Sequence, residues 1–257
     1  TVTVNSNVSP TFTPVATLCA GDTAPALPSQ SLESITGTWS PAVIDNQTSG
    51  IYTFTPDAGQ CATTATLTVN VDPAPVGGTL SGSNTFCADG SGTLTLAGQT
   101  GIIEKWQSST VADFSSAVTD IANTTNTYNY NGIAATTYFR AVIGNGVCAD
   151  AFSTVATITI QPNTWTGAIN TSWTEAGNWS CDEVPSSTTD VVIAATANKP
   201  ILATNAAVKS LNVNASAEFI VTSGNNLTVT NAVTVATGGL MTLQNNANLL
   251  QLTDAAN

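Results

Sequence analysis

Apolar residues stand at every second position in several short, Thr-rich stretches of this chain. In residues 66–71 (TLTVNV), Leu67, Val69 and Val71 alternate with polar side chains, and TVTVN (1–5) and TITI (157–160) repeat the pattern. Such alternation puts one face of a strand on a core and the other in water. Turn signals such as DNQTSG, PDAGQ and GNG separate the stretches, and helical periodicity is almost absent. The pattern predicts an all-β protein.

Two consecutive units between these stretches share the same landmarks. Each contains a cysteine, a tryptophan about 20 residues later and a second cysteine after a turn; these are Cys19, Trp39 and Cys61, then Cys87, Trp106 and Cys148. We expect two tandem immunoglobulin-like β-sandwiches, with Trp39 and Trp106 in their cores.

The repeated strand text also predicts the module boundaries. Residues 1–5 are expected to be the last strand of a preceding module, 6–72 the first sandwich, 73–161 the second, and 162–257 a third unit. The short linkers contain Pro73, Pro75 and Pro162. Because proline restricts the backbone, the modules should lie end to end with limited bending.

The cysteines are expected to form disulfides, as in proteins that fold outside the reducing cytosol. Their matching placement predicts one bridge within each sandwich, Cys19–Cys61 and Cys87–Cys148, with buried free thiols as the alternative. Cys181 is then left over, either as a buried thiol or as half of a bridge to another chain.

After residue 210 the pattern of apolar and polar residues changes. Apolar pairs recur every six to eight residues from Leu211 to Leu240, separated by Asn, Gly, Ser and Ala. This predicts a β-solenoid in which each rung stacks on the one before, with Leu249, Leu250 and Leu252 inviting a further rung.

Three tryptophans, Trp165, Trp173 and Trp179, directly precede the predicted solenoid. We expect them to cap its open end and to seat it on the second sandwich. A carbohydrate-stacking patch is the alternative.

Charge and composition argue against several classes of function. The chain carries sixteen acidic and four basic residues, a net charge of −12, which excludes the basic surface that nucleic acid or an anionic membrane requires. It has no histidine and therefore lacks the commonest general base and metal ligand. No apolar run is long enough to span a bilayer.

Carboxylates are the remaining candidates for chemistry. Asp182 and Glu183 are adjacent, and Glu218 and Asp254 are the acids along the predicted solenoid, too few for a paired-acid hydrolase. No catalytic residue and no cofactor are therefore predicted. Calcium is the one metal considered, with Asp72 and Asp89 meeting across a junction or, alternatively, standing as solvated loop acids.

Three groups of residues resemble repeats of very large Bacteroidetes cell-surface proteins. They are ITGTWSP with YTFTPDAGQCATT, WQSST with TTYFRAVIGNGVC, and TWTGAINTSWTEAGNWS with VP and DVVI. Proteins of this kind include adhesins exported by type IX secretion, among them gliding-motility adhesins of the SprB kind. The resemblance implies a long filament on the outer surface of a Gram-negative bacterium, with neighbouring modules, polysaccharide or solid surfaces, and secretion machinery as partners. Asp22-Thr23-Ala24 matches the pattern on which such bacteria place O-glycans, with Thr23 as the acceptor.

These observations together predict a structural stalk segment of a cell-adhesion protein, which bears load and holds a binding tip away from the cell. The alternative function is a carbohydrate-binding module that uses the tryptophan cluster.

Overall fold

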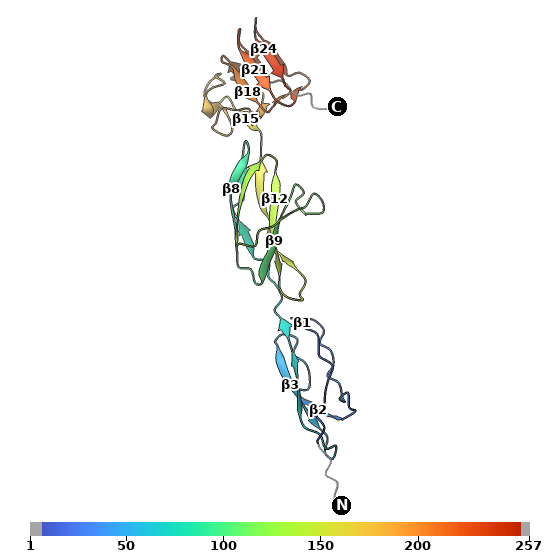
Figure 1. Ribbon diagram of the computed structural model, residues 1–257. Helices are drawn as coiled ribbons and strands as arrows, with labels where there is room; N and C mark the ends of the chain where they lie inside the picture. The colour runs from blue at the N-terminus through green and yellow to red at the C-terminus, as the bar shows by residue number, and fades with distance from the viewer. Residues whose placement is uncertain (1–6, 253–257) are drawn as a thin grey trace, which may run out of the picture.

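The computed structural model describes residues 7–252, which form an elongated row of three β modules (Figure 1). Within this range the only helical element is one 3-10 turn, η1 (Ala176–Asn178). No helix there has the length and apolar character that a membrane crossing requires. The predicted all-β class is confirmed. The prediction that residues 1–5 are the last strand of a preceding module concerns residues outside the described range.

The first module has one antiparallel sheet and one short parallel pair. Its strands are β1 (Leu18–Cys19), β2 (Gly37–Ser40), β3 (Gly50–Pro56), β4 (Ala65–Val69) and β5 (Val71–Asp72). The sheet order is β2-β3-β4, and β1 runs parallel to β5. Between residues 10 and 36 the chain is mostly without strands, and its apolar side chains, such as Phe12 and Leu27, pack against the core around Tyr52 and Val69.

The second module is built from two sheets on either side of one core. Its strands are β6 (Thr79–Ser81), β7 (Asn84–Phe86), β8 (Gly90–Ala97), β9 (Ile102–Ser109), β10 (Thr119–Ile121), β11 (Thr127–Ile133), β12 (Thr137–Gly144), β13 (Ala151–Phe152) and β14 (Ala156–Ile160). One sheet has the order β10-β9-β12-β14-β7 with β13 beside β12, and the other has the order β11-β8-β6.

The two tryptophans predicted for the sandwich cores are both packed there. Trp106 is fully buried in the core of the second module. Trp39 is half-buried and lies against the rings of Phe12 and Phe54, with centroids 4.6 and 5.2 Å away. Both indole N–H groups donate to backbone carbonyls. These contacts confirm the core positions predicted from the sequence.

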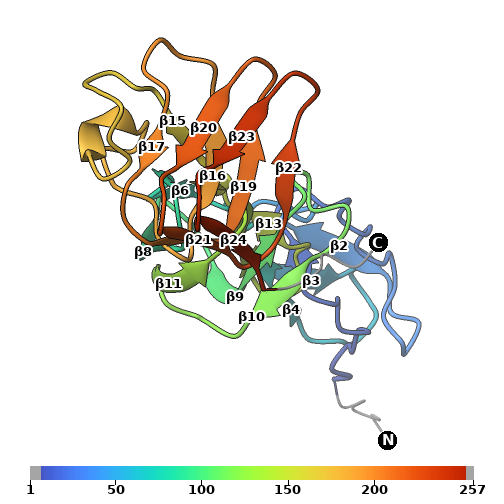
Figure 2. The same ribbon diagram turned by 90° about the horizontal axis from the view of Figure 1, so that it is seen from above.

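The third module contains three parallel sheets. Its strands are β15 (Asn163–Trp165), β16 (Asp190–Ile193), β17 (Ile201–Leu202), β18 (Ala206–Val208), β19 (Ser210–Val213), β20 (Glu218–Val221), β21 (Asn226–Val229), β22 (Val233–Val235), β23 (Leu240–Leu243) and β24 (Asn248–Gln251). The sheet orders are β15-β16-β19-β22, β17-β20-β23 and β18-β21-β24. Figure 2 shows β20 beside β23 and β19 beside β22.

From β16 onward, consecutive strands of this module lie in different sheets. From β16 onward each strand pairs with the third strand after it, so that Ala206 lies beside Leu227, and Leu227 beside Leu249. The polar corners redirect the chain after every few residues, and it returns to the same sheet only after two more strands.

Alternate residues of these strands fill a shared interior. Leu211, Val213, Phe219 and Val221 are buried there, whereas the residues between them are less enclosed. This alternation is the period of two that the sequence displays.

Candidate functional site

The disulfides connect one module to the next. Cys19 is bonded to Cys148, and Cys87 to Cys181, with Cα atoms 4.9 and 6.4 Å apart. Cys61 is an exposed free thiol. The predicted pairs Cys19–Cys61 and Cys87–Cys148 are therefore wrong, and Cys181 is neither a free thiol nor a link to another chain.

The pairing differs because the two cysteines of one module face opposite neighbours. Cys19 ends β1 and lies opposite Asp72, where the chain leaves the first module. Cys61 follows the β3 hairpin turn, and its carbonyl accepts the N–H of Val8, where the chain enters that module. Cys19 therefore reaches forward to Cys148 of the next module instead of back to Cys61.

The first junction holds its linker from both sides. The carbonyl of Asp72 accepts the N–H of Ala20 at 2.9 Å, and its carboxylate accepts the N–H of Val147 at 3.1 Å. The side-chain amide of Asn145 donates to the carbonyl of Pro73 at 2.7 Å. Gly146 has φ +56°, and the Asp72 carboxylate occupies the place where its Cβ would be. The GNG turn is thus shaped to receive the linker.

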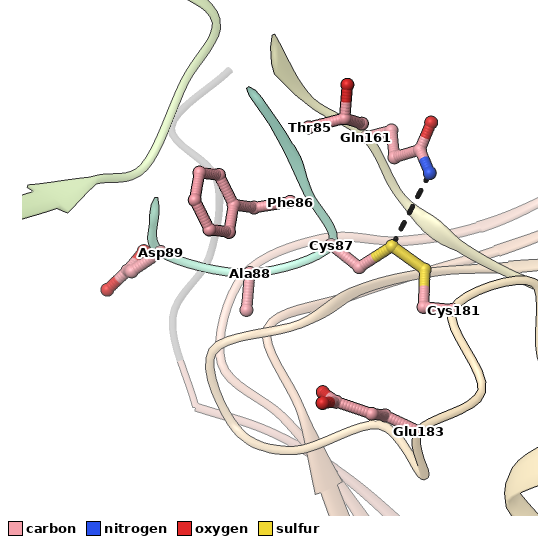
Figure 3. A pocket seen from close by; sticks show the side chains of 8 residues that line it. All are labelled: Thr85, Phe86, Cys87, Ala88, Asp89, Gln161, Cys181 and Glu183. Carbon is pink, nitrogen blue, oxygen red and sulfur yellow. Dashed lines mark hydrogen bonds between the residues drawn. A yellow bond between two sulfur atoms is a disulfide. The ribbon is translucent and has the colours of Figure 1, made fainter. Parts of the chain in front are cut away.

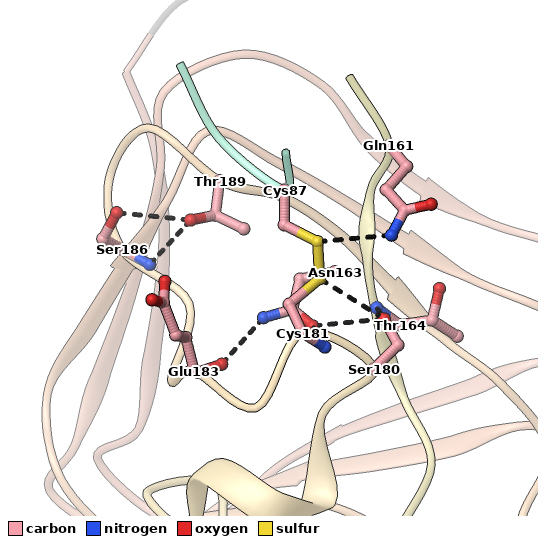
Figure 4. Close-up of a disulfide and its surroundings, with 9 residues drawn as sticks. All are labelled: Cys87, Gln161, Asn163, Thr164, Ser180, Cys181, Glu183, Ser186 and Thr189. Carbon is pink, nitrogen blue, oxygen red and sulfur yellow. Dashed lines mark hydrogen bonds between the residues drawn. A yellow bond between two sulfur atoms is a disulfide. The ribbon is translucent and has the colours of Figure 1, made fainter. Parts of the chain in front are cut away.

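The second junction is fastened through Asn163, which is buried (Figure 4). Its Nδ2 donates to the carbonyl of Glu183 at 2.8 Å, and its Oδ1 accepts the N–H of Cys181 at 3.3 Å. The hydroxyl of Ser180 accepts the N–H of Thr164 at 2.9 Å. These bonds hold the loop that carries Cys181 against the linker, within reach of Cys87.

A pocket of about 410 Å³ lies beside the second disulfide (Figure 3). Two exposed acids, Asp89 from the second module and Glu183 from the third, are among its lining residues. Asp72 belongs to the first junction and Asp89 to the second, so of the two alternatives the meeting of these acids across one junction does not occur. Within residues 7–252, no group of three or more His, Cys, Asp or Glu residues could hold a metal ion.

The three clustered tryptophans are buried at the start of the parallel sheets. Trp165, Trp173 and Trp179 are 0, 1 and 2% exposed, and their rings meet edge to face at centroid distances of 5.0 and 4.7 Å. Trp173 also packs on Phe219 at 5.0 Å. In the described structure, the residues of the buried apolar cluster that contains these tryptophans all belong to the third module. The tryptophans therefore close the interior of their own module. No ring face is open for stacking on a sugar.

Asn178 organises the loop around these tryptophans, a role that the sequence analysis missed. It is fully buried, and its Oδ1 accepts the N–H groups of Ile169 and Asn170, both at 2.9 Å. Its Nδ2 donates to Asn170 Oδ1 at 2.8 Å and to the carbonyl of Ser172 at 2.9 Å. Asn178 lies between Trp173 and Trp179 and directly precedes the second of them, in GNWS. A polar side chain at such a position is the signal that could have identified it.

The remaining candidate residues lie apart from one another. Asp182 and Glu183 are exposed in the loop after Cys181, and Glu218 forms an ion pair with Lys199. Thr23 is exposed near Cys19. Asp254 lies outside the described residues. Among the described candidate acids, Asp182 and Glu183 are sequence neighbours, and Glu183 lines the same pocket as Asp89.

The fold and the junctions define a class of protein, an all-β chain of successive modules joined by disulfides. Such bridges are typical of proteins that fold outside the reducing cytosol. Residues 76–162 match a family model described as a domain of unknown function (DUF8696), and residues 164–257 match another described as a domain of unknown function (DUF8693). The two matches divide where the second module ends and the third begins.

Comparison with curated proteins finds no match. Among solved structures, the crystal structure of the N-terminal four Ig domains of Dscam1 isoform 8.4 is similar at 10% sequence identity and a TM-score of 0.33. The similar region covers 62% of this chain and 48% of that one. At this level the likeness carries no argument about function.

Proposed function

We propose that this chain is a stalk segment of a large secreted bacterial cell-surface protein, which holds a binding region away from the cell and bears load. The observation that carries the proposal is that a disulfide crosses each of the two junctions between modules. Modules joined only by a peptide linker are expected to move relative to one another. When a disulfide adds a second covalent connection, two neighbouring modules can bend only about the line that joins the linker to the disulfide.

The hydrogen bonds at each junction oppose the remaining hinge motion. Asn145 and the Val147 N–H hold Pro73 and Asp72 from the side of the second module, and Ala20 holds Asp72 from the side of the first. The first junction is therefore stiff in the directions in which a single linker would bend.

We infer that residues 162–252 form a β-solenoid whose first turn is capped by the tryptophans. The parallel pairing of every third strand supports this fold, as does the single apolar interior. Polar residues also stack at equivalent corners: Asn205 Oδ1 accepts the N–H of Asn226 at 2.8 Å, and Asn248 Nδ2 donates to Asn226 Oδ1 at 2.9 Å. Stacked turns of this kind make a rigid rod suited to a stalk.

The resemblance to Bacteroidetes adhesin repeats supports a more specific proposal. The chain would be exported by type IX secretion, displayed on the outer surface and used in adhesion or gliding motility. The exposed Thr23 hydroxyl is accessible for O-glycosylation. A carbohydrate-binding role for the tryptophan cluster is not proposed, because its rings are buried.

Adhesion under flow tests the stalk function in the full-length surface protein. Replacing Cys19 and Cys148 by serine removes the first junction disulfide and should reduce cell retention under shear, while leaving surface display and static binding unchanged. Ala58→Ser/Ala149→Ser, which replaces two exposed residues and removes no cysteine, is the matched control. Unchanged retention under shear in the double variant would contradict a load-bearing role, as would direct binding of polysaccharide by this segment alone.

Small-angle X-ray scattering tests the stiffness on which that function depends. The oxidised chain should scatter as one extended particle, and the Cys19→Ser/Cys148→Ser variant as a broader set of bent shapes. Equal flexibility in both proteins would argue against the junction as the source of rigidity.

A further inference from the structure

The first and second modules place one cysteine at the same structural position. The β3 residue opposite Trp39 is Phe54, and the β12 residue opposite Trp106 is Ala141. Seven residues after each of them, beyond the hairpin turn, stands a cysteine; the two are Cys61 and Cys148.

The other cysteine of each module is equivalent as well. Cys19 lies opposite Asp72 on a short strand that runs parallel to the exit strand β5. Cys87 directly follows β7, which runs parallel to the exit strand β14 and pairs Phe86 with Ile160. In both modules this forward cysteine is bonded to the module that follows.

The chain segment around Val8 lies next to Cys61, as the first linker lies next to Cys148. The sulfur of Cys148 lies 3.6 Å from the carbonyl oxygens of Asp72 and Pro73. Beside Cys61, the N–H of Val8 donates to the Cys61 carbonyl at 2.9 Å, and the carbonyl of Val8 accepts the N–H of Thr63 at 2.9 Å.

The sequence before each of these contacts is repeated. The letters TVTVN precede Ser6-Asn7-Val8, as TLTVN precedes Val71-Asp72-Pro73. Val8 therefore corresponds to Pro73 in sequence. Each lies next to the cysteine that follows the hairpin turn of its module, Val8 next to Cys61 and Pro73 next to Cys148.

We propose that Cys61 is half of a third junction disulfide, whose other half is a cysteine at the Cys19 and Cys87 position of a β module preceding residue 1 in a longer chain. In the described structure Cys61 is the exposed free thiol, whereas its equivalent, Cys148, is bonded to the preceding module. The two thiols would lose two protons and two electrons to a disulfide oxidant, which becomes a dithiol. This inference adds a bond to the proposed stalk, and its test reads covalent pairing and not stiffness.

A fusion protein tests the pairing directly. A copy of residues 7–65 in which Cys61 is replaced by serine is placed ahead of Thr1, so that TVTVNSN continues the copy as TLTVNVD continues the first module. The oxidised protein is alkylated without reduction, digested with a protease of broad specificity and analysed by mass spectrometry. We expect a peptide that links Cys19 of the copy to Cys61, and alkylation at Cys61 should fall from near-complete in the unfused chain to near-absent.

The same fusion with Cys19→Ser in the copy is the matched control and should restore alkylation of Cys61. Peptides containing Cys19–Cys148 and Cys87–Cys181 report that the natural modules have folded in both fusions. Continued alkylation of Cys61 alongside those two bridges would overturn the proposal, as would a Cys61–Cys61 bridge between two chains. Peptide mapping of the natural longer protein gives a second reading, in which a free Cys61 is also a refutation.

Discussion

Reducing the disulfides should greatly lengthen this chain when it is unfolded by pulling on its two ends. Cys19 and Cys148 are 129 residues apart in sequence, so the intact bridge removes the segment between them from the stretched path. At about 3.3–3.6 Å per extended residue, reduction should add about 430–460 Å to the fully unfolded length.

The two bridges should not contribute additively, because their loops overlap. Once the path has crossed from Cys19 to Cys148, it reaches Cys181 along the backbone, and the Cys87–Cys181 bridge shortens nothing further. Removing that second bridge should therefore leave the unfolded length unchanged. Removing the first bridge leaves a loop with a separation of 94 residues in place of one of 129, and should add about 115–125 Å.

Optical-tweezer or atomic-force measurements on Cys61→Ser protein can make this comparison without thiol exchange from the free cysteine. The variants are Cys19→Ser/Cys148→Ser and Cys87→Ser/Cys181→Ser, each measured with and without reductant. Bridges within the modules, Cys19–Cys61 and Cys87–Cys148, would instead give additive contributions that sum to about 340–370 Å. That result would refute the reasoning.

Three further predictions concern single side chains. Asn178→Ala removes the four hydrogen bonds of a fully buried side chain and should lower the free energy of unfolding of the third module by about 2–5 kcal/mol in urea denaturation, whereas exposed Asn231→Ala should change it by less than about 0.5 kcal/mol. Trp173→Ala should cost about 3–5 kcal/mol, and polysaccharide should not quench tryptophan fluorescence of the unmutated protein; saturable quenching would contradict the buried cluster. Hydrogen bonds, first of all from the Thr11 hydroxyl, lower the pKa of Glu33 from 4.5 to about 2, so the stability that Glu33 contributes should be fully present above pH 4.5 and be lost as the pH falls toward 2. Thermal melts of Glu33→Gln should lack this part of the pH dependence, and an identical profile in both proteins would count against it.

Strands and core tryptophans could be predicted from the sequence because they depend on local alternation. The TLTVNV pattern directly indicates which side chains of β4 and β5 face the core. The order Cys87, Trp106, Cys148 indicates the core tryptophan of the second module, which is fully buried. Burial of the Trp165 cluster was also expected, although the sequence left a sugar-binding patch open as an alternative.

The disulfide partners could not be predicted in the same way. The parallel pairing of β1 with β5, about 50 residues later, places Cys19 at the end of its module that adjoins the second module. No periodic pattern in the sequence indicates that pairing. The number of strands in each turn of the third module could not be predicted for a similar reason. Short strands at a regular step can pair with the next strand or with the third one, and only the turning of the corners decides between them.

The central claim is that disulfides join the modules to one another, and disulfide mapping of the oxidised chain tests it most directly. Mass spectrometry of a non-reduced digest should find peptides that link Cys19 to Cys148 and Cys87 to Cys181, with Cys61 alkylated. Peptides that link Cys19 to Cys61 and Cys87 to Cys148 would contradict the account.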